Sequence, residues 1–458
     1  MTSARYRSQS FWLDTTPGPL EPRPALTSET NVDVAIIGAG YTGLWTAYYL
    51  KELDPGLRVA IVEAEIAGFG ASGRNGGWCL GAMYGIDSLF EENPEGAIRL
   101  QRELFDTVDE VARVTVQEGI ECEWEKSGNV TVATSEPFRK QLLESLERWR
   151  TIGAEQEDVH WLEAEECAEL VRTRTNLGGL YLAHVAAMHP ARLVRGLAEV
   201  VEKRGVSIYE LSPAIELQQR SVVTPAGQLT ADTIVLATEA YTDSIRGHER
   251  ALIPAHSMMV ATAPLPDSVW DEIGFPSRVT FGDPRRKVTY GQRTADGRMA
   301  FGCRGSYFYG SKIKNRFSPE DPVFCEVRQV LEGFFPVLSE HAITHRWGGA
   351  LGIPRTWTPS VGLDRRAGFG WAGGYVGEGV GAANLAGRTL AELILAQKTH
   401  RTSLPLVGKP FPKWEPEPLR SMGYAALTRF AEALDSANLQ GRPTPRLRGA
   451  VYNHFVRK

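Results

Sequence analysis

Three glycines and one glutamate near the N-terminus have the residue types and spacing that hold a dinucleotide. Gly38, Gly40 and Gly43 follow a short apolar run at 33–37 and have the spacing G-x-G-x-x-G. The first glycine permits a tight turn, the second leaves space for a pyrophosphate beside the backbone, and the third lets a helix pack closely on the strand. Glu63 ends the next apolar run. Its carboxylate is placed to accept hydrogen bonds from ribose hydroxyls.

The elements that must position these residues follow in the order strand, turn, helix and strand. The predicted helix extends from the glycine turn to Leu53, and the second strand covers 58–62. The helix N-terminus should face the phosphates, because its unpaired N–H groups and its dipole favour an anion. An ordinary glycine-rich turn is the alternative. The complete order of elements favours a dinucleotide site.

A second glycine-rich segment follows at 66–85, with the sequence IAGFGASGRNGGWCLGAMYG. This density of glycines allows the backbone to lie close against a flat ligand. The alternative is a mobile surface loop. Phe69, Trp78 and Met83 disfavour that alternative, because large apolar side chains favour burial.

The composition is that of a large globular enzyme and excludes other classes. Of the 458 residues, 43% are hydrophobic and 23% are charged, which is ordinary globular usage. The net charge of −5 argues against a nucleic-acid partner. No apolar run reaches the roughly 18 residues of a membrane span. The N-terminus lacks the continuous apolar core of a signal peptide. We therefore expect a cytoplasmic protein.

The cysteines and histidines predict neither disulfides nor a metal site. The five cysteines are far apart and form no C-x-x-C motif. His341 and His345 would share a helix face at i, i+4, which is the one spacing that suits a metal, but no H-E-x-x-H motif accompanies them. We expect no bound metal.

The rest of the chain alternates helical and strand-like segments. The proline-rich residues 1–30 predict an extended arm, pinned to the body by Phe11, Trp12 and Leu13. Residues 122–134 predict two strands that reverse at 126–129. The cluster Arg285 to Lys287 suits a solvated face or, alternatively, a substrate charge. Further expected elements are helices at 97–118, 138–151, 191–203, 322–334 and 419–434, strands at 206–209 and 233–237, a hairpin turning at 295–297, and a glycine-rich strand and loop followed by a helix at 367–397.

These patterns predict the α/β class. We expect a Rossmann-type nucleotide-binding domain interleaved with an α+β substrate domain that is built on a mainly antiparallel sheet. The expected bounds are 1–95, 166–250 and 347–400 for the nucleotide-binding domain, 96–165 and 251–346 for the substrate domain, and 401–458 for a C-terminal extension.

Three motifs together resemble a known superfamily: GAGYTG with Glu63, the loop FGASGRNGG, and IVLATEAYT with the later GGYVGEGVG. On these motifs the chain resembles the FAD-dependent superfamily of D-amino-acid oxidase, glycine oxidase and sarcosine oxidase, and within it the gamma-glutamylputrescine oxidoreductase-like proteins. The likeness runs from about Phe11 to about Gln397. It implies FAD as the cofactor.

The resemblance also implies which residues hold FAD. The first turn and the ribose acid would hold the ADP half, the second loop would line the pyrophosphate and the flavin ring, and the late glycine run would reach the pyrimidine edge. The implied cofactor residues are Gly38, Gly40, Tyr41, Thr42, Gly43, Glu63, Ala64, Ser72, Gly73, Arg74, Asn75, Gly76, Gly77, Ala214, Thr238, Gly377, Gly379 and Val380.

Two departures from the superfamily indicate that FAD is noncovalent. Some sarcosine oxidases attach flavin through a cysteine in the segment that corresponds to 350–353, which reads ALGI here. Others use a histidine in the early glycine loop, where Arg74 and Asn75 stand.

The implied reaction is hydride transfer to flavin N5 from the carbon next to nitrogen in a primary or secondary amine or amino acid. The imine then hydrolyses to a carbonyl product, and oxygen or another acceptor takes the electrons. The implied substrate contacts are His256, Tyr307, Tyr309 and Trp347, and Arg355 is a candidate for a substrate carboxylate. A place in the hydrophobic core is the more common role of such aromatic residues and is the alternative for each of them.

Two other functions share the nucleotide motif. An NAD(P)H-dependent flavin monooxygenase or halogenase would carry a D-G motif after a late strand, where GGYVGEGVG stands here. A nonenzymatic NAD-binding sensor would bind no yellow chromophore.

Overall fold

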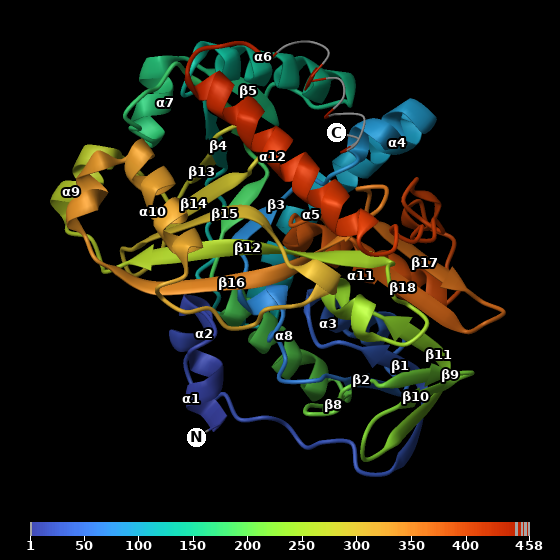
Figure 1. Ribbon diagram of the computed structural model, residues 1–458. Coiled ribbons are helices and arrows are strands. Elements are labelled where there is room, and N and C mark those ends of the chain that lie inside the picture. Colours follow the sequence, from blue (N-terminus) through green and yellow to red (C-terminus); the bar gives the residue numbers. More distant parts are fainter. Residues whose placement is uncertain (1, 445–447, 450–451, 453–455, 457–458) are drawn as a thin grey trace.

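The computed structural model describes residues 2–444, 448–449, 452 and 456, which form two large sheets with helices around them. Figure 1 shows the first sheet at the lower right and the second sheet above it. The predicted α/β class, with a parallel-stranded unit and a mainly antiparallel unit, is confirmed.

The first sheet is built around a parallel core of apolar strands. Its order is β17-β18-β11-β1-β2-β8, and β9 and β10 pair beside β11. In β1, Val34 to Ile37 pair with β2 on one side and with β11 on the other, all in parallel. Such strands are buried on both faces, which explains their continuous apolar runs. The strands are β1 (Glu29–Ile37), β2 (Val59–Val62), β8 (Ser207–Tyr209), β9 (Glu216–Gln218), β10 (Ser221–Val223), β11 (Gln228–Leu236), β17 (Ser360–Asp364) and β18 (Phe369–Gly373).

Helices cover the first sheet and join its strands. The buried cluster on one face joins Val34 and Ile61 of the sheet to Leu44, Leu197 and Leu390 of three helices. The helices of this part are α3 (Tyr41–Leu53), α4 (Ile86–Glu92), α5 (Pro94–Gln117), α8 (Pro190–Lys203) and α11 (Gly379–Ile394).

The second sheet has the order β16-β12-β15-β14-β13-β4-β6-β5, and its pairs are antiparallel except for β13 with β4. Its strands are β4 (Asn129–Val132), β5 (Val159–Leu162), β6 (Gly179–Leu182), β12 (Leu252–Thr262), β13 (Thr280–Gly282), β14 (Thr289–Arg293), β15 (Met299–Tyr307) and β16 (Ile343–Pro354); its helices are α6 (Glu136–Thr151), α7 (Ala164–Leu170), α9 (Asp267–Ile273), α10 (Pro322–Phe334) and α12 (Leu419–Leu439). The short strands β3 (Trp78–Leu80) and β7 (Val185–Ala187) form a third sheet.

Several local predictions need correction. Residues 122–134 contain one strand, β4, which pairs with β13 and β6 rather than with a neighbour in a hairpin. Glu125 instead bridges Ala187. His341 follows a 3-10 helix and His345 lies in β16, so the two residues share no helix face. The pairing of a strand is decided by distant segments, which local sequence does not reveal.

The N-terminal arm and one domain boundary also differ from expectation. The arm begins with two short helices, α1 (Thr2–Arg7) and α2 (Phe11–Asp14), although Phe11, Trp12 and Leu13 are buried as predicted. Strand β6 belongs to the second sheet although it lies within 166–250. The expected boundary at 166 is therefore too early.

The cluster Arg285 to Lys287 is partly buried and its charges are paired, so it does not form a solvated face. Arg285 pairs with Asp283, Arg286 with Asp435 and Lys287 with Glu326 and Glu432. Asp435 and Glu432 belong to α12, which crosses the second sheet in Figure 1. The cluster fastens the C-terminal helix to the sheet.

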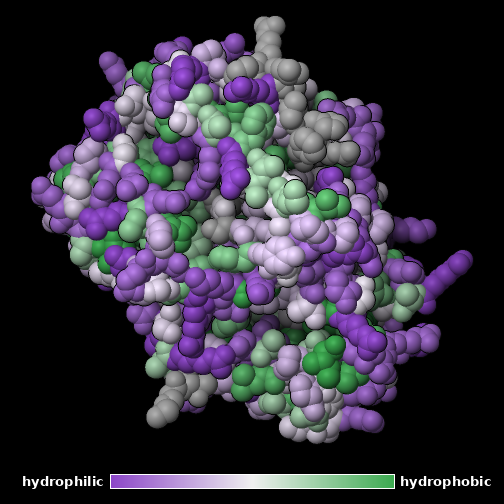
Figure 2. All heavy atoms as spheres, in the orientation of Figure 1, coloured by the Kyte–Doolittle hydropathy of each residue, from purple (hydrophilic) through white to green (hydrophobic). Residues whose placement is uncertain are grey.

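In the described part of the chain, no helix is long and apolar enough to cross a membrane. Within the same residues, no group of three or more histidine, cysteine and acidic side chains is placed to hold a metal. On the face drawn in Figure 2, hydrophobic residues form small separate groups among hydrophilic ones.

Candidate functional site

A cavity of about 310 Å³ lies where the carboxyl ends of β1, β2 and β11 meet. Ligands of open α/β sheets bind at this edge. The second sheet contributes Ala350 and Leu351 of β16, and the loop before α10 contributes Asn315. The cavity is lined by Ile37, Gly38, Gly40, Tyr41, Thr42, Val62, Glu63, Ala64, Glu65, Gly68, Phe69, Gly70, Ala71, Ser72, Asn75, Pro213, Ala214, Ala237, Thr238, Glu239, Ala240, Tyr241, Ser244, Ile245, Asn315, Ala350, Leu351, Tyr375, Gly377, Gly379, Val380 and Ala383.

The first glycine turn forms one wall of this cavity. Gly38 has φ +103°, and a Cβ atom there would lie 2.7 Å from the main-chain oxygen of Ala237. Gly43 packs against the Gly38 oxygen so closely that a Cβ atom would overlap it. At Gly40, a Cβ atom would lie 3.0 Å from Ser72 Oγ. The turn therefore needs glycine for close packing on the backbone at Gly38 and Gly43, whereas a Cβ atom at Gly40 would require only a small movement of Ser72.

Two helix N-termini point at the cavity. Helix α3 starts after Gly40, and α11 starts at Gly379; neither has a side-chain cap from its preceding residue. Ser72 Oγ accepts the N–H of Tyr41 at 2.9 Å. Uncapped helix N-termini favour anions such as phosphate or a reduced cofactor ring.

Glu63 faces the same space from the end of β2. Its carboxylate accepts the N–H of Ala39 at 2.9 Å and that of Glu65 at 3.0 Å. Burial raises the pKa of Glu63 to about 7, and these two N–H groups oppose the rise. A carboxylate beside two helix N-termini fits a ligand that carries ribose hydroxyls and phosphates.

The second glycine loop divides into cavity-lining and packing residues. Ser72 lines the cavity, and so does Asn75, whose amide donates to the oxygens of Ala71 and Ser72. Gly73, Gly76 and Gly77 are not among the lining residues. A Cβ atom at Gly76 would lie 2.7 Å from the Tyr290 ring, and one at Gly77 would lie 2.6 Å from the Met188 oxygen. Gly76 and Gly77 are placed for packing on β14 and on Met188, the residue after β7.

Arg74 is buried behind the cavity wall. Its side chain is 2% exposed and stacks on the Phe69 ring at 4.4 Å. Its Nη1 donates to the Asn315 main-chain oxygen at 3.1 Å. Burial lowers the pKa of Arg74. Among the described residues no carboxylate forms an ion pair with Arg74. Its guanidinium instead donates hydrogen bonds to the main-chain oxygens of Asn315 and Gly348.

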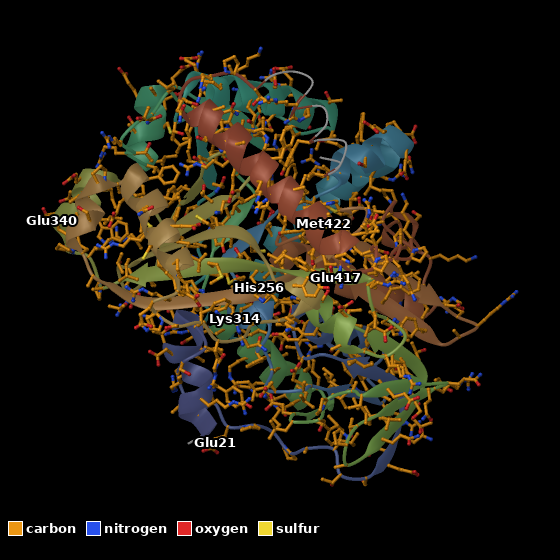
Figure 3. All side chains as sticks on the ribbon, viewed as in Figure 1. Glu21, His256, Lys314, Glu340, Glu417 and Met422 are labelled. Atoms are coloured by element: carbon orange, nitrogen blue, oxygen red, sulfur yellow. The ribbon has the colours of Figure 1, made fainter. Side chains whose placement is uncertain are left out.

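The five expected substrate residues are not brought together at this cavity. Trp347 is 2% exposed and donates to the Arg74 oxygen at 2.9 Å. His256 is fully buried and accepts the N–H of Lys314 at 3.1 Å. Figure 3 shows His256 beside Lys314, with Glu417 near the start of α12. Neither residue lines the cavity: Trp347 bonds to Arg74 behind its wall, and His256 bonds to Lys314, which precedes the lining residue Asn315.

The other three expected substrate residues point elsewhere. The Tyr307 hydroxyl donates to Glu417 Oε1 at 2.7 Å. Tyr309 is 63% exposed. Arg355 Nε pairs with Glu415 Oε1 at 3.0 Å, so its charge is already compensated. The prediction that Arg355 holds a substrate carboxylate is not supported by this geometry.

Sequence reasoning missed six polar residues that line the cavity: Glu65, Glu239, Tyr241, Ser244, Asn315 and Tyr375. Tyr241 donates to Asn315 Oδ1 at 2.7 Å, which joins the two sheets across the cavity. Tyr375 lies in the late glycine run and Glu239 in the motif ATEAYT, so position beside these motifs was the available signal. Asn315 carried no such signal.

The chain matches known proteins over most of its length. Residues 33–393 match the family model described as FAD dependent oxidoreductase. The chain is 29% identical over 384 residues to the probable oxidoreductase OrdL of Haemophilus influenzae, covering 81% of this chain and 85% of that protein. It is also 29% identical over 381 residues to gamma-glutamylputrescine oxidoreductase of Escherichia coli, covering 81% of this chain and 86% of that protein.

The fold is similar to that of L-proline dehydrogenase from P. horikoshii, with a TM-score of 0.67 and 19% identity. The match covers 84% of this chain and 96% of that one. At this identity the likeness shows a shared fold alone.

Proposed function

The chain belongs to the family of FAD-dependent oxidoreductases, and from that premise we propose that it oxidises a primary or secondary amine or an amino acid. The observation that carries the proposal is the composition of the cavity wall. Loops of the first sheet supply the glycine turns and the acid that suit a nucleotide. Ala350, Leu351 and Asn315 close the cavity from the second sheet's side. A dinucleotide site that is bounded on one side by a second sheet suits a substrate held between that sheet and the cofactor.

The cofactor of this family is FAD, and the donor set fits it. When bound, FAD would accept one hydride, which carries two electrons, from a substrate. In our proposal Glu63 accepts hydrogen bonds from the ribose, and the N-termini of α3 and α11 face the phosphates and the ring. Gly40 leaves the space that a side chain would fill.

We infer that the cofactor is noncovalent. Ala350 and Leu351, which line the cavity at the end of β16, have no nucleophilic atom. The buried thiols Cys79 and Cys303 have pKa values raised by burial, so they are held as unreactive thiols, and neither lines the cavity.

The proposed substrate supplies both electrons from one carbon–nitrogen unit. The carbon next to nitrogen loses a hydride and the nitrogen loses a proton, which leaves an imine; water then adds and gives a carbonyl compound and the released amine or ammonia. The protein's part is to hold the neutral amine in position and exclude water. The similarity to gamma-glutamylputrescine oxidoreductase supports an amine as the substrate of this protein as well.

The reaction can be tested through its products. Purified protein loaded with FAD is incubated with a panel of polyamines, N-alkyl amino acids and amino acids, with oxygen or an artificial dye as the acceptor. A hydrazine reagent traps the carbonyl product, and the released amine is measured separately. We expect equal amounts of both products from at least one class. No carbonyl product from any amine would contradict the proposal.

A further inference from the structure

Glu239 has a strained backbone at the edge of the cavity. It is the first residue of the 3-10 helix Glu239–Ser244, directly after β11 and Thr238, and its φ is +46°. A residue with a Cβ atom rarely adopts this left-handed conformation, which is unfavourable unless the surroundings hold it. Residues with such strain are frequent at functional sites, where the surrounding structure stabilises them.

The carboxylate of Glu239 bonds to the ends of two other strands. Its Oε1 accepts the N–H of Gly352 in β16 at 3.1 Å, and its Oε2 accepts the N–H of Gly374 after β18 at 2.7 Å. A Cβ atom at Gly352 would lie 3.0 Å from Oε1, so glycine is needed for this close approach. One side chain thus joins the ends of β11, β16 and β18.

A second strained residue lies in the turn that Glu239 holds. Val376 is fully buried with φ +55°, a conformation that a β-branched residue very rarely adopts. Its N–H donates to the main-chain oxygen of Gly352 at 3.4 Å. The main-chain oxygen of Gly352 therefore accepts a hydrogen bond from Val376, and the N–H of Gly352 donates one to Glu239. The neighbours of Val376, Tyr375 and Gly377, both line the cavity.

The charge of Glu239 is costly where it lies. No arginine, lysine or histidine forms an ion pair with it among residues 2–444, and its carboxylate is held by backbone N–H groups. Burial raises its pKa to about 7. A buried carboxylate without a cation is disfavoured. A neutral side chain at this position would avoid the desolvation of a charge, and a glycine would avoid the strain as well.

We propose that Glu239 is a positioning residue for FAD. By clamping Gly352 and Gly374 it holds the turn 374–377, which lines the cavity and leads into α11, in the one conformation that receives the cofactor. The proposal rests on FAD binding and is independent of the substrate's identity.

The test compares variants of Glu239 in apoprotein that is titrated with FAD. Glu239→Gln keeps the size but replaces one acceptor oxygen with a donor that opposes an N–H group. Glu239→Gly relieves the strain and removes the clamp. We expect both variants to raise the Kd for FAD by at least about tenfold, the loss expected for two charge-assisted bonds. We also expect a changed visible circular dichroism spectrum of the flavin that does bind.

Two controls separate positioning from mere stability. Glu340→Gln makes the same chemical change at an exposed position that does not line the cavity and that Figure 3 shows far from His256 and Lys314. Val327→Ala removes buried methyl groups from α10 and should lower the melting temperature with an unchanged Kd for FAD. The proposal is overturned if both Glu239 variants bind FAD with the wild-type Kd and spectrum, even when their melting temperatures fall. If Glu239→Gly does not fold, the isosteric Glu239→Gln decides alone.

Discussion

Thr42 Oγ1 and the hydroxyl oxygen of Tyr375 lie 2.9 Å apart, and both residues are buried. Thr42 is in the first turn of α3, and Tyr375 precedes α11. This hydrogen bond joins the first glycine turn to the last, across more than three hundred residues of chain. The two helix N-termini that face the cavity are therefore fixed relative to each other.

Removing this bond should weaken FAD binding moderately. Tyr375→Phe deletes one partner of a buried hydrogen bond, which is worth about 1 kcal/mol net, or about a fivefold rise in the Kd for FAD. Thr42→Val deletes the other partner. The double variant should cost little more than either single variant, and titration of the three apoproteins forms a double-mutant cycle. Fully additive losses would show that the bond does not couple the two helices.

Gly40→Val should abolish retention of FAD. The Cβ atom alone would lie 3.0 Å from Ser72 Oγ, and the branched methyl groups would occupy the space beside the N-terminus of α3. The absorbance of the purified protein near the flavin maximum measures retention. Gly333→Val is the matched control, since a Cβ atom there meets no heavy atom within 4 Å. A folded, yellow Gly40→Val protein would place the phosphates elsewhere.

The affinity for FAD should rise with pH through the titration of Glu63. Burial raises the pKa of this acid to about 7 in the protein without ligand. Ribose hydroxyls bond more strongly to the carboxylate than to the neutral acid. Below pH 7 the binding of FAD must therefore release a proton from Glu63, which weakens the affinity, and above pH 7 this cost disappears. The Kd for FAD should therefore fall about tenfold between pH 5.5 and 7.5, by ordinary proton linkage.

The variant Glu63→Gln supplies the comparison for this pH dependence. Its Kd should be higher than that of the wild type at pH 8, and its change with pH should be smaller. Any slope that remains can come from Glu239, whose pKa is also raised to about 7. An unchanged slope in Glu63→Gln would show that Glu63 does not contact the ligand.

Arg355→Ala should leave substrate selectivity nearly unchanged. Arg355 pairs with Glu415, and both side chains are more than a third exposed. Exposed ion pairs contribute roughly 0–1 kcal/mol, so the melting temperature should change little. The ratio of kcat/KM for a carboxylate-bearing amine to that for a matched amine without the carboxylate is the decisive quantity. A fall of that ratio by tenfold or more would restore Arg355 as a carboxylate ligand.

Local sequence predicted the parts of this fold that depend on backbone chemistry. The glycine spacing marked a turn where Gly38 adopts φ +103° and Gly43 packs on it. The helix predicted at 322–334 has those bounds in the structure, and a proline, which is favoured in the first turn, is its first residue. Apolar runs identified β1 and β2, which are buried on both faces.

The rest depends on contacts between distant segments. Gly76 and Gly77 suggested a ligand, yet their neighbours are Tyr290, Gln292 and Met188. Asn315 reaches the cavity only because its loop returns to Tyr241. Similarly, the left-handed backbone of Glu239 is stabilised by Gly352 and Gly374, which lie more than one hundred residues away. No spacing rule connects such residues.

The central claim is that an amine supplies the electrons, and an anaerobic experiment tests it most directly. The FAD-loaded protein is mixed without oxygen with each candidate amine, and separately with NADPH, while the flavin absorbance is followed. We predict that at least one primary or secondary amine bleaches the flavin without any NAD(P)H, and that the bleaching becomes faster as pH rises, because the ammonium form has no lone pair to assist departure of the hydride. Rapid bleaching by NADPH with none by any amine would contradict the account and identify a monooxygenase-type enzyme instead.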